Sequence, residues 1–318
     1  MLARCCTMML GVVGERDFRH RKISQRGKEV LPMMNRRQFV GAGLLTGGAL
    51  ATGALPVKAA QIRRANDVVL LGPDKIRLSR LAMGTGTFSG KVQRELGIPG
   101  LADMLNYGYD QGLLFFDTGD SYGTHPHIKE ALKRVPREKI AIMTKSSART
   151  AEDMRAALDR FRQEVGVDYF DIVLLHAQTA PNWPEQRVGA MEVLAEAREK
   201  GIVRTYGASI HSIDALRTAA KTPWLRVALV RINPIGVRMD TDTATVVAGM
   251  RDLKAAGKGV MGMKILGEGA LGDRVDLALR HAVSLDCLDC FTIGAANRGE
   301  LGDLIKRIPA ASEAVNAA

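Results

Sequence analysis

The chain has 318 residues, of which 46% are hydrophobic, so it is long enough to bury one large core or two modest ones. Its formal charge of +11 is concentrated at the start, because residues 1–60 hold 10 Lys/Arg and 3 Asp/Glu and leave only +4 for the remainder. This weakly basic body does not interleave basic with aromatic residues, which argues against nucleic acid as a partner.

The N-terminal segment is predicted to be a leader that is separate from the folded domain. Arg36 and Arg37 precede a charge-free stretch at 39–55, and Val57 and Ala59 occupy the −3 and −1 positions of a cleavage site. This order of charged, weakly apolar and small residues is typical of a signal for export.

Twin arginines ahead of a Gly/Ala-rich segment resemble a Tat export signal, which we assign to residues 34–59 of a leader that spans 1–59. The resemblance implies the Tat export machinery as a partner and a periplasmic or otherwise exported protein. A membrane span needs about 20 strongly apolar residues, so we expect no stable span in the mature chain. The alternative is an uncleaved signal that anchors the chain in the membrane. Residues 1–33 lack this pattern and could be a misassigned start.

Residues 60–318 are predicted to form one domain, because no linker or low-complexity tract follows residue 66. At its start, residues 70–81 alternate in polarity around the turn Gly72-Pro73-Asp74, which predicts a β-hairpin. We expect this hairpin to plug the closed end of the main sheet.

Beyond the hairpin, short apolar runs alternate with amphipathic segments. In one such segment Met154, Leu158, Phe161 and Val165 recur at helical spacing. The apolar runs lie at 80–87, 113–116, 140–145, 169–176, 203–209, 226–233, 260–266 and 290–294. Strand and helix in repeated alternation predict a parallel sheet.

The spacing of the runs indicates which parallel sheet the chain forms. Consecutive strand ends lie 24 to 33 residues apart, and eight such units fill the 259 residues after the leader. This matches an α/β fold of the (β/α)8 TIM-barrel type, which typically needs about 250 residues. An open doubly wound sheet would favour G-x-G-x-x-G after its first strand, and GTGTFSG at 84–90 does not fit. The eight strand ends are Gly84, Asp117, Lys145, His176, Ser209, Asn233, Lys264 and Gly294.

In such barrels the carboxyl ends of all strands face one mouth, where the chemistry is located. This places Asp117, Tyr122, Lys145 and His176 around one cavity. A tyrosine can donate a proton at neutral pH, and a nearby ammonium makes this easier by stabilising the phenolate. Lys145 would supply that charge, Asp117 would hold Lys145 in place, and His176 would orient a substrate oxygen. These groups can protonate a carbonyl oxygen but lack an electron source, so hydride would come from a bound nicotinamide.

Six motifs resemble the aldo/keto reductase superfamily over most of residues 67–308: LAMGTGT, FFDTGDSYG, IMTK, FDIVLLH, YGAS and TIGAANRGELGDLI. The resemblance implies that Asp117, Tyr122, Lys145 and His176 form a catalytic tetrad with Tyr122 as general acid. It implies an NAD(P)H-dependent oxidoreductase that reduces an aldehyde or ketone and whose partner is a small carbonyl or alcohol substrate.

The resemblance also implies a set of cofactor-binding residues. Gly84 and Thr85 would lie beside the nicotinamide, and Ser209 would bind its carboxamide. Asn233 stands where the family often has glutamine, and Met263 stands in place of a stacking aromatic residue. Two loops would bind phosphates: one contains Leu266 and Gly267, and the other contains Gly294, Ala296, Asn297 and Arg298. Arg298 is the only basic residue of the last loop, so NADP is expected, with NAD as the alternative.

Two other functions stay open. A Schiff-base lyase or aldolase would use Lys145 or Lys264 to attack a carbonyl on the same scaffold. A non-catalytic or accessory nucleotide-binding barrel is the other alternative, because Ile210 and Met263 depart from the family pattern. Export to a compartment with little free nicotinamide cofactor also favours it.

The remaining polar and sulfur-containing residues are predicted to be structural. His125, His127 and His211 are expected to be solvated loop residues, and no metal site is predicted because they lack acidic or cysteine partners. Trp183 is expected to form a wall of the substrate pocket.

Cys287 and Cys290 are expected to be buried small residues, and a disulfide between them stays open.

Overall fold

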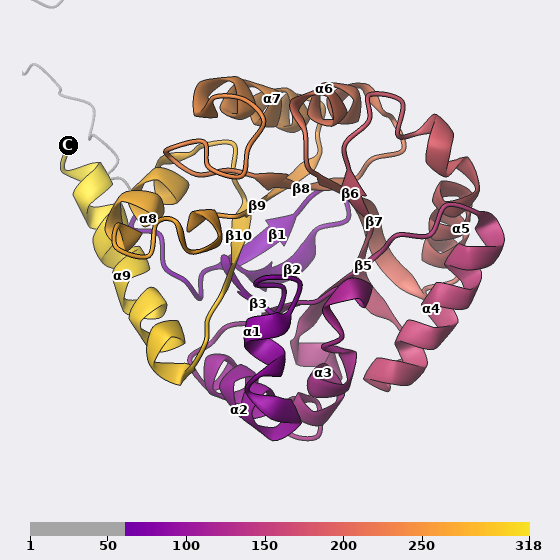
Figure 1. Ribbon diagram of the computed structural model, residues 1–318, viewed down its shortest axis with the longest axis horizontal. Coiled ribbons are helices and arrows are strands. Elements are labelled where there is room, and N and C mark those ends of the chain that lie inside the picture. Colours follow the sequence, from indigo (N-terminus) through magenta and orange to yellow (C-terminus); the bar gives the residue numbers. More distant parts are fainter. Residues whose placement is uncertain (1–60) are drawn as a thin grey trace, which may run out of the picture. The chain divides into compact units, whose positions relative to one another are not determined.

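The computed structural model describes residues 61–318. The predicted leader at 1–59, with its export signal and its uncertain start, lies outside the described residues. Eight parallel strands close into a barrel in the order β10-β3-β4-β5-β6-β7-β8-β9, and helices surround it (Figure 1). The predicted (β/α)8 barrel is therefore confirmed.

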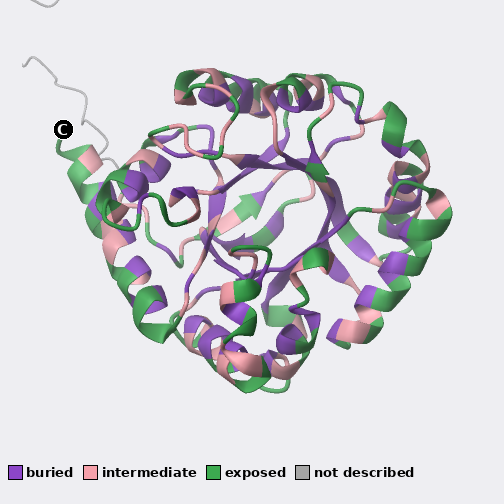
Figure 2. Cartoon of the chain, viewed as in Figure 1, coloured by how far each residue is buried: buried purple, intermediate pink, exposed green. Residues whose placement is uncertain are grey.

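The barrel strands coincide with the apolar runs of the sequence. They are β3 (Leu81–Gly84), β4 (Phe115–Asp117), β5 (Ala141–Ser146), β6 (Phe170–Gln178), β7 (Val203–Ile210), β8 (Val227–Arg231), β9 (Gly259–Met263) and β10 (Cys290–Gly294). Their residues are buried on both faces, as expected for parallel strands that helices cover (Figure 2).

Helices follow the strands and form the outer layer. The described helices are α1 (Lys91–Arg94), α2 (Gly97–Asp110), α3 (His125–Ala131), α4 (Ala151–Val165), α5 (Val188–Glu199), α6 (Ile213–Lys221), α7 (Thr243–Ala255), α8 (Val275–Ser284) and α9 (Arg298–Asn316). Helix α4 illustrates how the sequence sets their limits. The hydroxyl of Thr150 accepts a hydrogen bond from the amide of Asp153 at 3.1 Å, and Gly166 ends the helix with φ of 73°.

The core has two parts, one on each side of the barrel wall. Inside the barrel lie side chains such as Phe115, Met143 and Ile172. Between the strands and the helices lies a larger cluster that includes Phe161 and Leu194. The inner part fills the barrel below its mouth, so only the end where the strands finish is open for a site.

The predicted hairpin closes the opposite end of the barrel. Strands β1 (Val68–Leu71) and β2 (Ile76–Ser79) pair antiparallel, and the side chains of Leu71, Ile76 and Leu78 join the inner core. Asp74, in the turn between them, accepts a hydrogen bond from Thr205 at 2.6 Å and pairs with Arg198 at 2.6 Å and with Arg226. The plug is thus attached to the barrel by apolar packing and by ion pairs.

Both described cysteines are buried and free. Cys290, on β10, belongs to the inner core, whereas Cys287 belongs to the outer one. The barrel wall therefore separates their environments, which explains why the C-x-x-C spacing gives no disulfide. Within residues 61–318, no helix is long and apolar enough to cross a membrane.

Candidate active site

The site is built around a buried ion pair at the mouth of the barrel. Asp117 ends β4, and Lys145 lies near the end of the adjacent β5. The ammonium of Lys145 is 1% exposed, pairs with Asp117 and donates to the carbonyl of Thr118 at 2.7 Å. Thr292, on β10, donates to the other carboxylate oxygen of Asp117 at 2.7 Å.

Burial acts to lower the pKa of Lys145, but its interactions with Asp117 and Tyr122 together outweigh burial and leave that pKa above its ordinary value. The amine therefore stays protonated at neutral pH.

Tyr122 lies against this ammonium. It ends a short 3-10 turn (Asp120–Tyr122) just after β4, and the Lys145 nitrogen is 4.8 Å from the centre of its ring. Gly86 makes room for the ring, since a Cβ at that position would lie 2.5 Å from a ring carbon. Burial raises the pKa of the Tyr122 phenol, and the Lys145 charge opposes that rise. The phenol is therefore a protonated donor next to a cation that stabilises its conjugate base.

His176, near the end of β6, completes the predicted group. Its ring meets that of Tyr122 edge to face, with centroids 5.7 Å apart and planes at 82°. Burial and the charge of Lys145 lower the pKa of His176 to about 4. The imidazole is therefore neutral at pH 7 and can donate one hydrogen bond without bringing a second positive charge. The structure brings Asp117, Tyr122, Lys145 and His176 together.

A second imidazole, which the sequence analysis did not place in the site, lies beside His176. The His211 ring centroid is 6.2 Å from that of His176, and its Nδ1 is 2.6 Å from the guanidinium of Arg231. Because a guanidinium only donates, Nδ1 must accept, so the proton lies on Nε2 and is donated to the Ser209 hydroxyl at 3.0 Å. Burial and Arg231 lower the pKa of His211 to about 3.

The prediction that the three histidines are solvated is wrong. His125 and His127 are buried at the start of α3, and His211 is packed among His176, Ser209 and Arg231. His125 lies between Glu164, at 2.7 Å, and Thr144, at 2.9 Å. The loop after β4 turns these side chains inward, so their polarity was a poor guide to exposure.

Trp183 also differs from its prediction as a pocket wall. Its side chain is 1% exposed, lies in the outer core and donates to the carbonyl of Ala215 at 3.3 Å. The loop after β6 thus anchors itself against α6 with this tryptophan.

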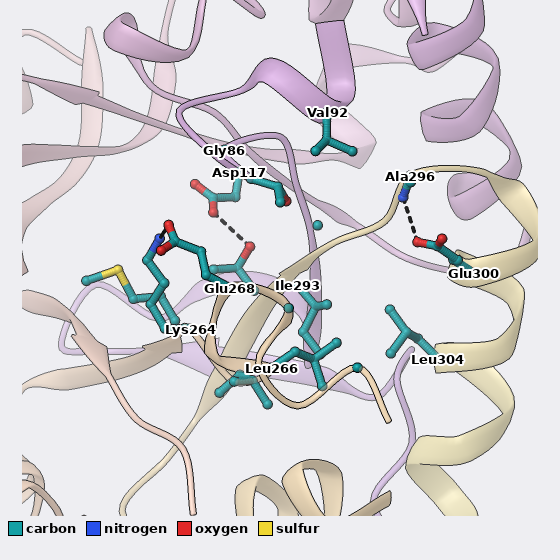
Figure 3. A pocket seen from close by; sticks show the side chains of 18 of the residues that line it. Gly86, Val92, Asp117, Lys264, Leu266, Glu268, Ile293, Ala296, Glu300 and Leu304 are labelled. Carbon is teal, nitrogen blue, oxygen red and sulfur yellow. Dashed lines mark hydrogen bonds and ion pairs between the residues drawn. The ribbon is translucent and has the colours of Figure 1, made fainter. Parts of the chain in front are cut away.

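A cavity of about 480 Å³ lies at the barrel mouth (Figure 3). Of the tetrad, Asp117 and Tyr122 line it, whereas Lys145 and His176 do not. Met263 and the α9 residues Glu300, Leu304 and Arg307 also line it. Figure 3 shows Lys264 and Glu268 meeting on the Asp117 side, whereas Glu300 and Leu304 lie on the far side.

The proposed cofactor residues divide into two groups. Five of them line the cavity: Gly84, Met263, Leu266, Gly294 and Ala296. The other six lie outside its lining: Thr85, Ser209, Asn233, Gly267, Asn297 and Arg298.

Several residues of the second group hold loops in place. The hydroxyl of Thr85 donates to the carbonyl of Asp117 at 2.9 Å, and Asn233 bonds Val237 through both its amide atoms. Asn297 caps α9 by accepting from the amide of Glu300 at 3.0 Å, and Arg298 pairs with Asp103 outside the cavity. These contacts hold in place the loops that carry the lining residues.

The sequence analysis missed the far wall and one internal ion pair. Glu300, Asp303, Leu304 and Arg307 all line the cavity and recur on one face of α9 at helical spacing. That periodicity, directly after the last strand, could have identified them. Lys264 was considered, but its partner Glu268 was not.

Within residues 61–318, no group of three or more His, Cys, Asp or Glu side chains could hold a metal ion.

Known proteins resemble this chain in sequence. The matches include "Probable aldo-keto reductase 1" of Glycine max, 31% identical over 169 residues that cover 48% of this chain and 47% of the relative. They also include the NADH-specific methylglyoxal reductase of Escherichia coli, 25% identical over 176 residues that cover 46% of this chain and 53% of the relative. The chain therefore spans about half the length of these relatives.

A solved aldo-keto reductase of Bombyx mori in complex with NADP has the same fold, with a TM-score of 0.60 and 17% identity over 80% of this chain and 94% of that one. The sequence model of the aldo/keto reductase family matches residues 80–284, which is more than half of the chain and extends from β3 to the end of α8. The chain belongs to the aldo/keto reductase family.

Proposed function

We propose that the protein is an NAD(P)H-dependent oxidoreductase that reduces a small aldehyde or ketone, with Tyr122 as the general acid. The observation that carries this proposal is the convergence of Tyr122, Lys145 and His176 beside a cavity that Asp117 and Tyr122 line. A tyrosine, a locked ammonium and a neutral imidazole suit protonation of an oxygen that becomes negatively charged.

Each residue of the tetrad has a separate task in this proposal. Tyr122 donates its proton to the substrate oxygen, and Lys145 stabilises the phenolate that remains. His176 is neutral, so it donates a hydrogen bond that orients the same oxygen and does not compete as an acid. Asp117 keeps Lys145 charged and fixed beneath the tyrosine ring.

The cavity suits a nicotinamide dinucleotide in the chemistry of its walls. Met263 and Leu229 form an apolar wall next to the tetrad, where a nicotinamide ring could pack, and Gly84, Gly86 and Gly294 leave room for close approach. The lining residues of α9 would face the adenosine half. The bound cofactor, NADP or NAD, would supply the hydride that the tetrad lacks. The family and the NADP complex of the Bombyx mori relative support this choice.

The contacts disfavour the Schiff-base alternative. A lysine that attacks a carbonyl must first be neutral, which usually requires a lowered pKa. The pKa of Lys145 is raised instead, because Asp117 is its partner. Lys264 is held in an ion pair with Glu268.

Substitution of Tyr122 by phenylalanine tests the proposal. We expect the variant to reduce a panel of aldehydes and ketones at least about 100-fold more slowly, because a general acid contributes roughly that much or more. Its affinity for NADPH and NADH, followed by fluorescence, should stay within about twofold. The matched control is Tyr109→Phe, since Tyr109 packs in the outer core. Full activity of Tyr122→Phe would show that this tyrosine is not the acid.

We also propose export through a Tat-type signal at residues 34–59, on the strength of the sequence alone. The expected outcome is a mature protein that begins near residue 60 in the periplasmic fraction, which N-terminal sequencing after cell fractionation would detect. Substitution of Arg36 and Arg37 by lysine should keep the precursor inside the cell. An exported protein that still begins before residue 34 would contradict this assignment.

A further inference from the structure

The cationic groups that line the cavity are already paired within the chain. Of the described lining residues, Lys264 and Arg307 are the cationic ones, and Arg307 is bound to Asp276 at 2.9 Å and to Asp303 at 2.6 Å. Lys264 is bound to Glu268. An anion that enters this cavity therefore finds a cation only by displacing a carboxylate.

The pair of Lys264 and Glu268 lies on the Asp117 side of the cavity. Lys264 directly follows Met263, which lines the tetrad end of the cavity, and both Lys264 and Glu268 line it as well. A dinucleotide whose nicotinamide lies beside Tyr122 and whose adenosine extends along α9 has its diphosphate between these two ends. Lys264 is the lining cation on the Asp117 side, whereas the other one, Arg307, belongs to α9 (Figure 3).

The backbone holds this pair in an unusual conformation. Lys264 has φ of 60° and Glu268 has φ of 59°, values in the left-handed region that cost energy for residues other than glycine. Gly267 and Gly269 on either side of Glu268 also have positive φ. Such strain persists where the surrounding structure imposes it, often in ligand clamps and switch regions.

Glu268 has a second cation outside the cavity lining. Its other carboxylate oxygen is 3.0 Å from the guanidinium of Arg238. Burial acts to raise the pKa of Glu268, but its bond to Lys264 and the charges of Lys264 and Arg238 leave that pKa below its ordinary value. The carboxylate is therefore ionised at neutral pH, and Arg238 can keep it when Lys264 is released.

We infer that Glu268 is an internal counter-anion for Lys264, which the diphosphate of the nicotinamide cofactor must displace in order to bind. This inference rests on the proposed function. Lys264 is then a diphosphate-binding residue, and Glu268 lowers the affinity of the free protein for any ligand that carries a diphosphate at this position. Exchange of one anion for another at a partly buried cation also makes binding less favourable than at an unpaired one.

Binding of ADP-ribose and of adenosine to the full chain and to Glu268→Gln tests the inference. ADP-ribose has the diphosphate without the nicotinamide, and adenosine has neither. We expect Glu268→Gln to bind ADP-ribose roughly tenfold more tightly, because the amide no longer competes for Lys264. The affinity for adenosine should change by less than about twofold. The matched control is Asp110→Asn, which removes a carboxylate that pairs with Arg134 outside the cavity lining and should alter neither affinity.

Unchanged or weaker binding of ADP-ribose by Glu268→Gln would overturn the inference. The carboxylate of the wild-type protein would then either have no effect on ADP-ribose binding or favour it. If Glu268→Gln does not fold, Lys264→Gln decides the question: it should weaken ADP-ribose binding about tenfold and leave adenosine unaffected. Unchanged ADP-ribose binding by Lys264→Gln would overturn the inference as well. A wild-type chain that binds neither NADPH, NADH nor ADP-ribose would instead refute the proposed function.

Discussion

Two carboxylates that bind cations lie at opposite ends of the barrel, and their surroundings differ. Asp74, in the hairpin at the closed end, pairs with Arg198 and Arg226, whose side chains are 38% and 25% exposed. Asp117, at the mouth, pairs with Lys145, whose side chain is 1% exposed. The carboxylates are equally buried, at 7% and 6% exposed, but the arginines keep part of their hydration, so the cost of desolvation at the closed end falls mainly on Asp74.

The pair at the mouth has given up that hydration. A buried ion pair is a poor source of stability, because the cost of removing both charges from water offsets their attraction. Its charge is instead directed at the Tyr122 ring in a place that water does not screen. Similar ion pairs thus attach the hairpin at the closed end of the barrel and serve the proposed chemistry at its mouth.

The largest effect should follow from breaking the buried pair. Lys145→Met leaves the carboxylate of Asp117 buried without its cation, so we expect a loss of about 3–5 kcal/mol in the free energy of unfolding. Carbonyl reduction should also become undetectable, because the phenolate of Tyr122 loses its stabilising charge. Urea unfolding and activity assays on the same preparation measure both effects. A Lys145→Met variant that keeps its activity would show that the buried pair does not serve the proposed chemistry.

Breaking the cluster at the closed end should affect stability alone. Asp74→Asn is expected to lower the free energy of unfolding by about 1.5–3 kcal/mol, the usual range for hydrogen bonds to a charged group, with activity within about twofold of wild type. The pKa of Asp74 is lowered, because its bonds to Arg226, Thr205 and Arg198 outweigh burial, which acts to raise it.

A lowered folded-state pKa means that the stabilisation by Asp74 is present above the unfolded value of about 3.9 and is lost as pH falls through the folded pKa. The difference between wild type and Asp74→Asn should therefore shrink below about pH 4. A difference that persists at pH 2 would mean that packing in the turn, and not the charge, attaches the hairpin.

At the mouth, the dependence of stability on pH should reflect the burial of His176. The folded-state pKa of His176 is about 4, below the ordinary 6.5, so its neutral form is stable in the fold and the unfolded chain takes up the proton first. Stability should thus fall as pH drops from 6.5 to about 4. His176→Gln should reduce that fall by roughly 1–3 kcal/mol in urea unfolding at the two pH values. An identical fall in both proteins would show that His176 is already protonated near pH 6.

The smallest effect is expected at a single arginine of the closed end. Arg198→Gln removes one partly exposed partner and leaves Arg226 and Thr205 on Asp74. The free energy of unfolding should change by less than about 1 kcal/mol, and the change should vanish in high salt. A larger, salt-independent loss would indicate that Arg198 acts through packing of its stem.

Most of the barrel could be predicted from the sequence, because its two periodicities repeat at nearly constant spacing. The strand ends Asp117, Lys145 and His176 were found because charged residues that end buried runs in a parallel sheet have to meet at one edge. The hairpin was found because its turn combines Gly72, Pro73 and Asp74 between alternating strands.

The loops were predicted less well, since polarity does not say which way a loop folds. His125 and Trp183 look like surface residues by type and position, but the loops after β4 and β6 return to the outer core and bury them. His211 could have been placed at the mouth, because it lies two residues after Ser209 and side chains two apart share a face of a strand. The pairing of Lys264 with Glu268 depends on a left-handed backbone conformation at both residues, which no sequence pattern predicts.

The position of β10 has a consequence for how the protein is made. This strand pairs with both β9 and β3, so it is the segment that completes the ring, and its Thr292 holds Asp117. A ribosome has synthesised about nine-tenths of the polypeptide before this strand emerges. Until then β3 has a free edge and the carboxylate at the mouth lacks one of its donors. Assembly of the tetrad is therefore one of the last events in the biosynthesis of the chain, and a message truncated before residue 290 would yield an open sheet that is prone to pair with other chains.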